Sequence, residues 1–78
     1  MGRAEIDLLL RRGDALLGVE CKRADAPGMT RSMATAMEDL GLARLAVVHP
    51  GTKRYPLADG VEVVPLEALA AGEGLFPG

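Results

Sequence analysis

The chain has 78 residues, of which 49% are hydrophobic and 26% are charged, and its formal net charge is −2. A chain of this size forms one small domain at most, and its composition excludes wholesale disorder, which needs low hydrophobicity and a high net charge. The single cysteine excludes an internal disulfide framework, and the longest apolar runs are far shorter than the about 20 residues of a transmembrane helix.

Residues 4–11 and 15–22 predict two strands that are joined by a tight turn. Both segments are rich in aliphatic residues. The intervening Gly13 and Asp14 tolerate the backbone angles that a two-residue hairpin turn demands. The sequence therefore predicts a β-hairpin at the N-terminal end, with Arg12-Gly13 as the alternative position of the loop.

The turn sets which residues face each other across the hairpin. With a loop at residues 13–14, Asp7 lies directly opposite Glu20; with a loop one residue earlier, the two acids are diagonal neighbours on the same face. The same face also carries Glu5 and Lys22. The opposite face is apolar.

Two apolar groups of residues are predicted to be core. On the apolar face of the hairpin, Ile6 is expected to pair with Cys21, whose thiol then lies in the core. Residues 24–29 predict a loop, and residues 30–40 predict a helix that begins at Thr30 or Ser32 as its N-cap. Residues at helical spacing mark the side of this helix that we expect to be buried: Met29, Met33, Met37 and Leu40.

The second half of the chain predicts further strands and a short helix. Residues 42–49 are apolar almost throughout, which is typical of a central strand covered on both faces, and His49 is expected at its rim. Shorter elements complete the pattern: an edge strand at 53–57 that contains Pro56, a turn at Asp59-Gly60, a strand at 61–64, and a helix at 66–71 after Pro65. The predicted fold class is α/β (α+β), a mixed sheet of four to five strands with an N-terminal β-hairpin and one main helix.

The charged face of the hairpin is the part of the sequence that predicts a functional site. Asp7 and Glu20 repel each other unless a cation lies between them, and hard carboxylate oxygens suit Mg²⁺ or Mn²⁺. Lys22 shares a strand face with Glu20, and a lysine beside a metal-bound water can stabilise charge that develops on a phosphate. The alternative is a solvated face on which opposite charges are mildly stabilising and have no further role.

The motifs Glu5-Ile6-Asp7 and Glu20-Cys21-Lys22 resemble the strand acid and the following Glu-x-Lys strand of the PD-(D/E)xK nuclease superfamily. Within it, the chain is most similar to the nuclease-like domain of unknown function at the C-terminal end of many prokaryotic AAA-type ATPases. That pattern continues here, over about residues 3–70 in all, with His49-Pro50-Gly51, Tyr55-Pro56-Leu57 and the segment from Gly60 to Leu69.

The resemblance implies a metal site and a catalytic lysine. Asp7 and Glu20 would ligate the metal together with the backbone carbonyl of Cys21, and Lys22 would assist the attacking water. It also implies a single nuclease-like domain over residues 1–71, a truncated restriction-endonuclease-like core that lacks the usual first helix. Residues 72–78 are expected to form a flexible tail. The chain has no Gly-rich phosphate loop ending in Gly-Lys-Ser/Thr, so ATP binding is not implied.

Two functions follow as hypotheses. The first is Mg²⁺- or Mn²⁺-dependent hydrolysis of DNA phosphodiester bonds, and the alternative is a non-catalytic protein-interaction module with a degenerate nuclease fold. One main helix leaves apolar area of the sheet uncovered, so we expect a homo-oligomer or a protein partner that covers it. Without a transmembrane segment or a signal-peptide-like start, we expect no membrane partner and a cytoplasmic location.

Overall fold

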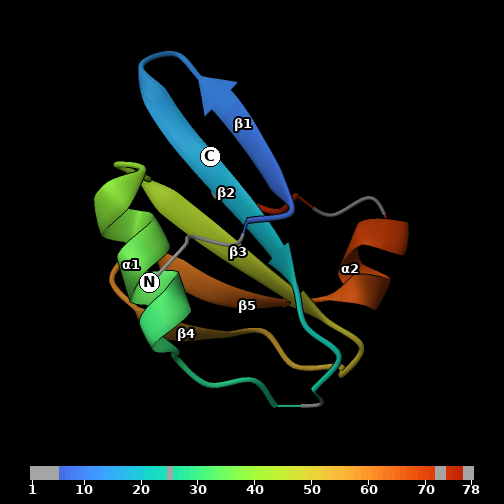
Figure 1. The fold of residues 1–78 in the computed structure, drawn as a ribbon. Helices are drawn as coiled ribbons and strands as arrows, with labels where there is room; N and C mark the ends of the chain where they lie inside the picture. The colour runs from blue at the N-terminus through green and yellow to red at the C-terminus, as the bar shows by residue number, and fades with distance from the viewer. Residues whose placement is uncertain (1–5, 25, 72–73, 77–78) are drawn as a thin grey trace.

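Five strands form a single mixed sheet in the order β1-β2-β3-β5-β4 (Figure 1). This computed structural model describes residues 6–24, 26–71 and 74–76. The elements in chain order are β1 (Leu8–Arg12), β2 (Ala15–Cys21), α1 (Arg31–Asp39), β3 (Arg44–His49), β4 (Tyr55–Ala58), β5 (Val61–Pro65) and α2 (Leu66–Ala70). The predicted fold class is confirmed, and each described element lies within a few residues of its predicted range.

The N-terminal hairpin has the register that its turn predicts. Leu8 of β1 lies opposite Val19 of β2, and the pairing continues without interruption to the turn. Gly13 has φ +61°, whereas Asp14 has no positive φ, as in a two-residue turn with glycine at its first position. The predicted strand starts earlier than β1, and its first residues, including Glu5, lie outside the described residues.

The centre of the sheet is β3, which runs parallel to both β2 and β5. Leu45 and Val47 of β3 pack into a core that includes Met33 of α1, whereas Ala46 packs on the other side against Ala68 of α2. Because alternate residues of a strand point to opposite faces, α1 and α2 cover opposite faces of the sheet. The prediction of a central strand covered on both faces is confirmed.

Helix α1 begins at its predicted cap. The hydroxyl of Thr30 accepts a hydrogen bond of 3.1 Å from the backbone N–H of Met33, which satisfies one of the free N–H groups of the first turn. Met33 is fully buried and Met37 is half-buried, as predicted. Met29 is 41% exposed, so its predicted burial is wrong: it precedes the cap and does not lie on the helix face.

The predicted pairing of Ile6 with Cys21 is wrong. The chain bends at Asp7, and Ile6 packs into the core on the α1 face, whereas Cys21 is exposed. The reason is an extra residue before β1: Leu8 pairs with Val19, and the N–H of Asp7 also donates to the carbonyl of Val19, which reverses the alternation of side chains. Gly18 leaves room for Ile6 on that face of β2. Ile6 Cγ2 lies 3.4 Å, and Leu42 Cδ1 2.8 Å, from the position that a β-carbon at Gly18 would take.

His49 was expected at the rim of the sheet, but it is only 1% exposed and lies in the core. It is the last residue of β3, and its ring lies edge-on to that of Tyr55 with 6.2 Å between ring centroids. Its Nε2–H donates a hydrogen bond of 2.8 Å to the carbonyl of Lys53. This imidazole is therefore a satisfied core group.

The end of the described chain returns to the sheet. Leu75 and Phe76 are half-buried against the cluster formed by Ala46, Val64 and Ala68. Residues 72–73 and 77–78 of the predicted tail lie outside the described residues. Within the described ranges, neither helix is long and apolar enough to cross a membrane.

Candidate functional site

Glu20 is a buried acid near the end of β2. The parallel register pairs it with Val47 of β3, whose side chain belongs to the core under α1. Paired residues of neighbouring strands point to the same face, so Glu20 lies on the α1 face of the sheet. Only 6% of its side chain is exposed, which is unusual for a carboxylate and requires a partner.

Lys22 supplies part of that partnership. Its Nζ lies 2.7 Å from Glu20 Oε2, and 34% of the lysine side chain remains exposed. The other carboxylate oxygen, Glu20 Oε1, is buried and has no hydrogen-bond partner. A buried acceptor without a partner costs about 1–3 kcal/mol, and more when it is charged. The ion pair therefore satisfies only half of this carboxylate.

Asp7 is held beside the same segment of β2. Its Oδ2 accepts a hydrogen bond of 2.7 Å from the backbone N–H of Cys21, and its own N–H donates to the carbonyl of Val19 at 3.0 Å. The nitrogen of Cys21 belongs to the peptide bond that follows Glu20. The exposed carboxylate of Asp7 is thus fixed next to the backbone that carries the Glu20–Lys22 ion pair.

Of the three predicted site residues, Glu20 and Lys22 form an ion pair, and Asp7 is bound to the backbone N–H of the residue between them. Cys21 lies between them, but its thiol is exposed and its N–H is bound by Asp7. Glu5, the other acid predicted for this face, lies outside the described residues. The structure thus pairs two of the predicted side chains directly and holds Asp7 beside them through the backbone of β2.

Carboxylate oxygens are the donors that a hard divalent cation prefers. Asp7 and Glu20 offer carboxylate oxygens, and Glu20 Oε1 is a buried oxygen that lacks a partner. Within residues 6–24, 26–71 and 74–76, no group of three or more His, Cys, Asp or Glu side chains lies together in a way that could hold a metal ion. A site with two carboxylates suits Mg²⁺, because water and substrate phosphates complete its coordination.

A pocket of about 240 Å³ lies where β2 and β3 end. It is lined by Cys21, Lys22, Arg23, Val48, His49, Pro50 and Leu66. The carboxyl ends of parallel strands are a common place for ligands in α/β sheets, but the walls of this pocket are almost wholly apolar. Val48 pairs with Val64, so the pocket lies on the α2 face of the sheet, whereas Glu20 lies on the α1 face. Sequence reasoning missed the pocket, because Val48 and Pro50 reach it through the parallel pairing of β2 with β3, and Leu66 through that of β3 with β5.

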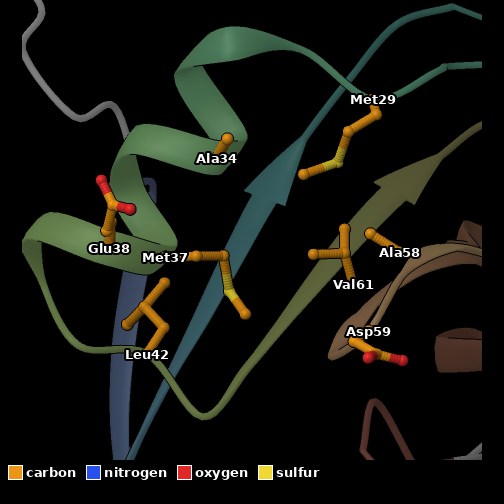
Figure 2. A pocket seen from close by; sticks show the side chains of 8 residues that line it. All are labelled: Met29, Ala34, Met37, Glu38, Leu42, Ala58, Asp59 and Val61. Carbon is orange, nitrogen blue, oxygen red and sulfur yellow. The ribbon is translucent and has the colours of Figure 1, made fainter.

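A second pocket, of about 330 Å³, lies between α1 and the turn from β4 to β5 (Figure 2). Met29, Met37, Leu42 and Val61 make its walls apolar. Its two acids, Glu38 and Asp59, lie on opposite sides of it in Figure 2, and no basic residue lines it. It therefore lacks the convergent polar groups of a polar-ligand site and does not suit a polyanion.

Comparison with known proteins places the chain in a family. A family model described as "Domain of unknown function (DUF4143)" matches residues 1–69. An uncharacterized protein of Mycobacterium tuberculosis and an uncharacterized protein of Mycobacterium bovis are each 46% identical to it over 66 residues, which is 85% of this chain. The chain spans 15% of the length of these curated relatives. No solved structure matches it. The chain belongs to the family of the domain of unknown function DUF4143.

Proposed function

We propose that the chain is a nuclease-like domain of the PD-(D/E)xK type, which binds Mg²⁺ or Mn²⁺ and hydrolyses phosphodiester bonds of DNA. The observation that carries this proposal is the buried oxygen Oε1 of Glu20, which has no hydrogen-bond partner. An unsatisfied buried acceptor in a folded protein calls for an explanation, and an ion is one of the few available. It belongs to the carboxylate that pairs with Lys22, one residue from the backbone N–H that Asp7 binds, which favours that explanation.

Asp7 and Glu20 would hold the cation between the edge of the hairpin and the core under α1. A bound divalent cation neutralises charge on a phosphate and generates a hydroxide nucleophile from water at neutral pH. Asp7 is exposed, so a substrate can reach this side of the site. The contact of Asp7 with the N–H of Cys21 keeps its carboxylate in place before any ligand arrives.

Lys22 would stabilise charge on the substrate. Its ammonium group is positioned by Glu20 Oε2, yet a third of its side chain is open to solvent. Positive groups that are fixed before the reaction stabilise the developing negative charge of a phosphoryl transition state without reorganisation.

Titration calorimetry with Mn²⁺ tests the proposal on four proteins: the wild type, Asp7→Asn, Glu20→Gln and Asp14→Asn. Asparagine at position 7 keeps an acceptor for the N–H of Cys21, and glutamine at position 20 keeps the shape of the side chain. We expect binding by the wild type and its loss in both site variants. Asp14→Asn removes an exposed acid from the hairpin turn and is expected to bind as the wild type does.

Nicking of supercoiled plasmid DNA in the presence of Mg²⁺ or Mn²⁺ tests the chemistry. We expect activity in the wild type and in Asp14→Asn, and none in Asp7→Asn or Lys22→Ala. Circular dichroism of each variant checks that it is folded. A wild type that neither binds Mn²⁺ nor nicks DNA would contradict the proposal.

The second candidate function is a non-catalytic protein-interaction module, and a specific observation favours it as well. Leu8, Leu9 and Leu10 are 50%, 46% and 37% exposed, side by side on β1. A run of exposed leucines on an edge strand is typical of a contact surface for protein. A wild type that binds no cation but associates with a protein through β1 would support this second candidate.

A further inference from the structure

The pocket between α1 and the turn from β4 to β5 combines buried walls with an adaptable rim (Figure 2). Leu42 and Val61, the most buried residues that line it, are 7% and 2% exposed. Met37 is half-buried, and Met29 is 41% exposed. Methionine side chains are unbranched and polarisable, so they adapt to apolar groups of different shapes and are common at surfaces that bind several partners. The pocket is therefore suited to the apolar side chains of a ligand that is not itself rigid.

The charged residues at this pocket are all acidic. Glu38 and Asp59 are exposed and lie on opposite sides of it (Figure 2). Asp39, the last residue of α1, is exposed as well. Within the described part of the chain, none of these three acids has a basic side chain at salt-bridge distance. Arg44 shares a neighbouring hollow with Asp59, but it does not line this pocket.

The end of α1 adds to this negative charge. The C-terminal end of a helix carries a partial negative charge, because its last carbonyl groups have no partner within the helix. A lysine or arginine in the last turn normally offsets that charge, but the last turn of α1 has no basic residue and contains Glu38 and Asp39. The two acids oppose the helix dipole, so a positive group from outside the chain would relieve an unfavourable interaction.

We propose that this pocket binds a basic, amphipathic peptide segment of another protein. Apolar side chains of the segment pack against Met29 and Met37, and lysine or arginine side chains on either side of them pair with Glu38 and Asp59. The volume of about 330 Å³ is at the lower end of the about 300–1,000 Å³ of small-molecule sites, which suits a few anchoring side chains of a larger ligand. Nucleic acids and anionic lipids are repelled by the same acids.

Fluorescence anisotropy with two labelled peptides tests the proposal. One peptide has leucine at helical spacing and lysine elsewhere, and in the other peptide glutamate replaces every lysine. We expect the wild type to bind the lysine peptide and not the glutamate peptide. Added salt should weaken the binding, because salt screens the attraction between exposed charges.

Substitutions at the rim identify the site. The double variant Glu38→Gln/Asp59→Asn removes both charges, keeps the shapes of the side chains, and should bind the lysine peptide about 3–10-fold more weakly and with less dependence on salt. Glu67→Gln is the matched control, because Glu67 is an exposed acid on α2. Met29→Ser should also weaken binding, whereas Leu66→Ser, which replaces an exposed leucine on α2, should not.

The methyl groups of the methionines locate the peptide by NMR. We expect the signals of Met29 and Met37 to shift as the lysine peptide is added, because both side chains line the pocket. The signal of Met33 should stay in place, since Met33 is fully buried on the same helix and does not line the pocket. Circular dichroism checks that each variant is folded, which is expected because every substituted side chain is exposed.

Three results would overturn the proposal. One is a wild type that binds the glutamate peptide as tightly as the lysine peptide, or that binds neither. Another is binding that the double variant and Met29→Ser leave unchanged. The third is a change in the methyl signals of Met29 and Met37 with protein concentration alone, which would assign the pocket to a second copy of this chain. No residue of the candidate metal site lines the pocket, so this proposal and the proposed function can fail separately.

Discussion

The two edges of the sheet are built differently. β4 has four residues, contains Pro56, and turns Tyr55 and Leu57 toward the core. The hydroxyl of Tyr55 also donates a hydrogen bond of 2.8 Å to the carbonyl of Pro27. β1 has no proline, and every one of its residues is exposed. Proline and a short strand are common devices that prevent pairing at an edge, and only the β4 edge has them.

The buried carboxylate with an unsatisfied oxygen lies on the same side of the molecule as the open edge. Glu20 belongs to β2, the strand next to β1, whereas the polar groups of His49 and Tyr55 next to β4 have their hydrogen bonds. The buried polar groups near β4 are therefore satisfied, whereas the hairpin half holds the unsatisfied oxygen and the run of exposed leucines.

The prediction with the largest expected effect compares the substitution of a leucine in the central strand with that of a leucine in the edge strand. Leu45 of β3 is 1% exposed, so Leu45→Ala leaves a cavity and should lower the free energy of unfolding by about 2–5 kcal/mol. Leu9→Ala should change it by less than about 0.5 kcal/mol in dilute, monomeric protein, because Leu9 is 46% exposed. Urea denaturation measures both, and losses of equal size would contradict the comparison.

The turns of the two halves give the next test. Gly60 and Gly13 have φ of +79° and +61°, so an alanine at either position costs about 1–2 kcal/mol in backbone strain. A β-carbon at Gly60 would also lie 3.0 Å from the carbonyl oxygen of Ala43, whereas one at Gly13 meets nothing within 4 Å. We therefore expect Gly60→Ala to lower Tm more than Gly13→Ala does, and the reverse order would show that the hairpin turn is the more tightly packed one.

Tyr55→Phe should have a smaller effect than Leu45→Ala or Gly60→Ala. It removes the hydrogen bond to Pro27 and should cost about 0.5–1.5 kcal/mol, because the carbonyl of Pro27 loses its partner. The effect should be local: amide exchange should accelerate in β4 and in the loop before α1, and stay unchanged in the β1–β2 hairpin. Faster exchange in the hairpin would show that the two halves do not behave independently.

The local features of the fold could be predicted from the sequence, and the neighbours of the buried strands could not. Gly13-Asp14 sets the register of the hairpin, and Thr30 sets the start of α1, because both act through adjacent residues. The apolar run of β3 predicts burial on both faces but carries no alternation that would say which strands lie beside it. The place of Ile6 was mispredicted, because it depends on the extra residue before β1, and because the open space at Gly18 is visible only once Leu42 and Leu45 are packed around it.

The candidate site likewise has features that the sequence predicts and features that it does not. The proximity of Glu20 and Lys22 followed from their spacing on one strand, whereas the bond of Asp7 to the N–H of Cys21 was not predicted, because it depends on the bend before β1. The burial of Glu20 did not follow, because it depends on β3 and α1, which lie elsewhere in the sequence. The pocket beside Lys22 and Arg23 requires β2 and β3 to end side by side, which nothing within the hairpin encodes.

The pairing of β2 with β3 also has a consequence for how the chain folds. β1 meets β2, and β4 meets β5, across short turns, whereas β2 meets β3 only after the segment that carries α1 has been closed into a loop. Loop closure costs chain entropy before its contacts can compensate, so distant pairings slow the search for the native state. We expect closure of this crossover to limit the refolding rate, and substitutions that strengthen the β2–β3 join to accelerate refolding more than those in either turn.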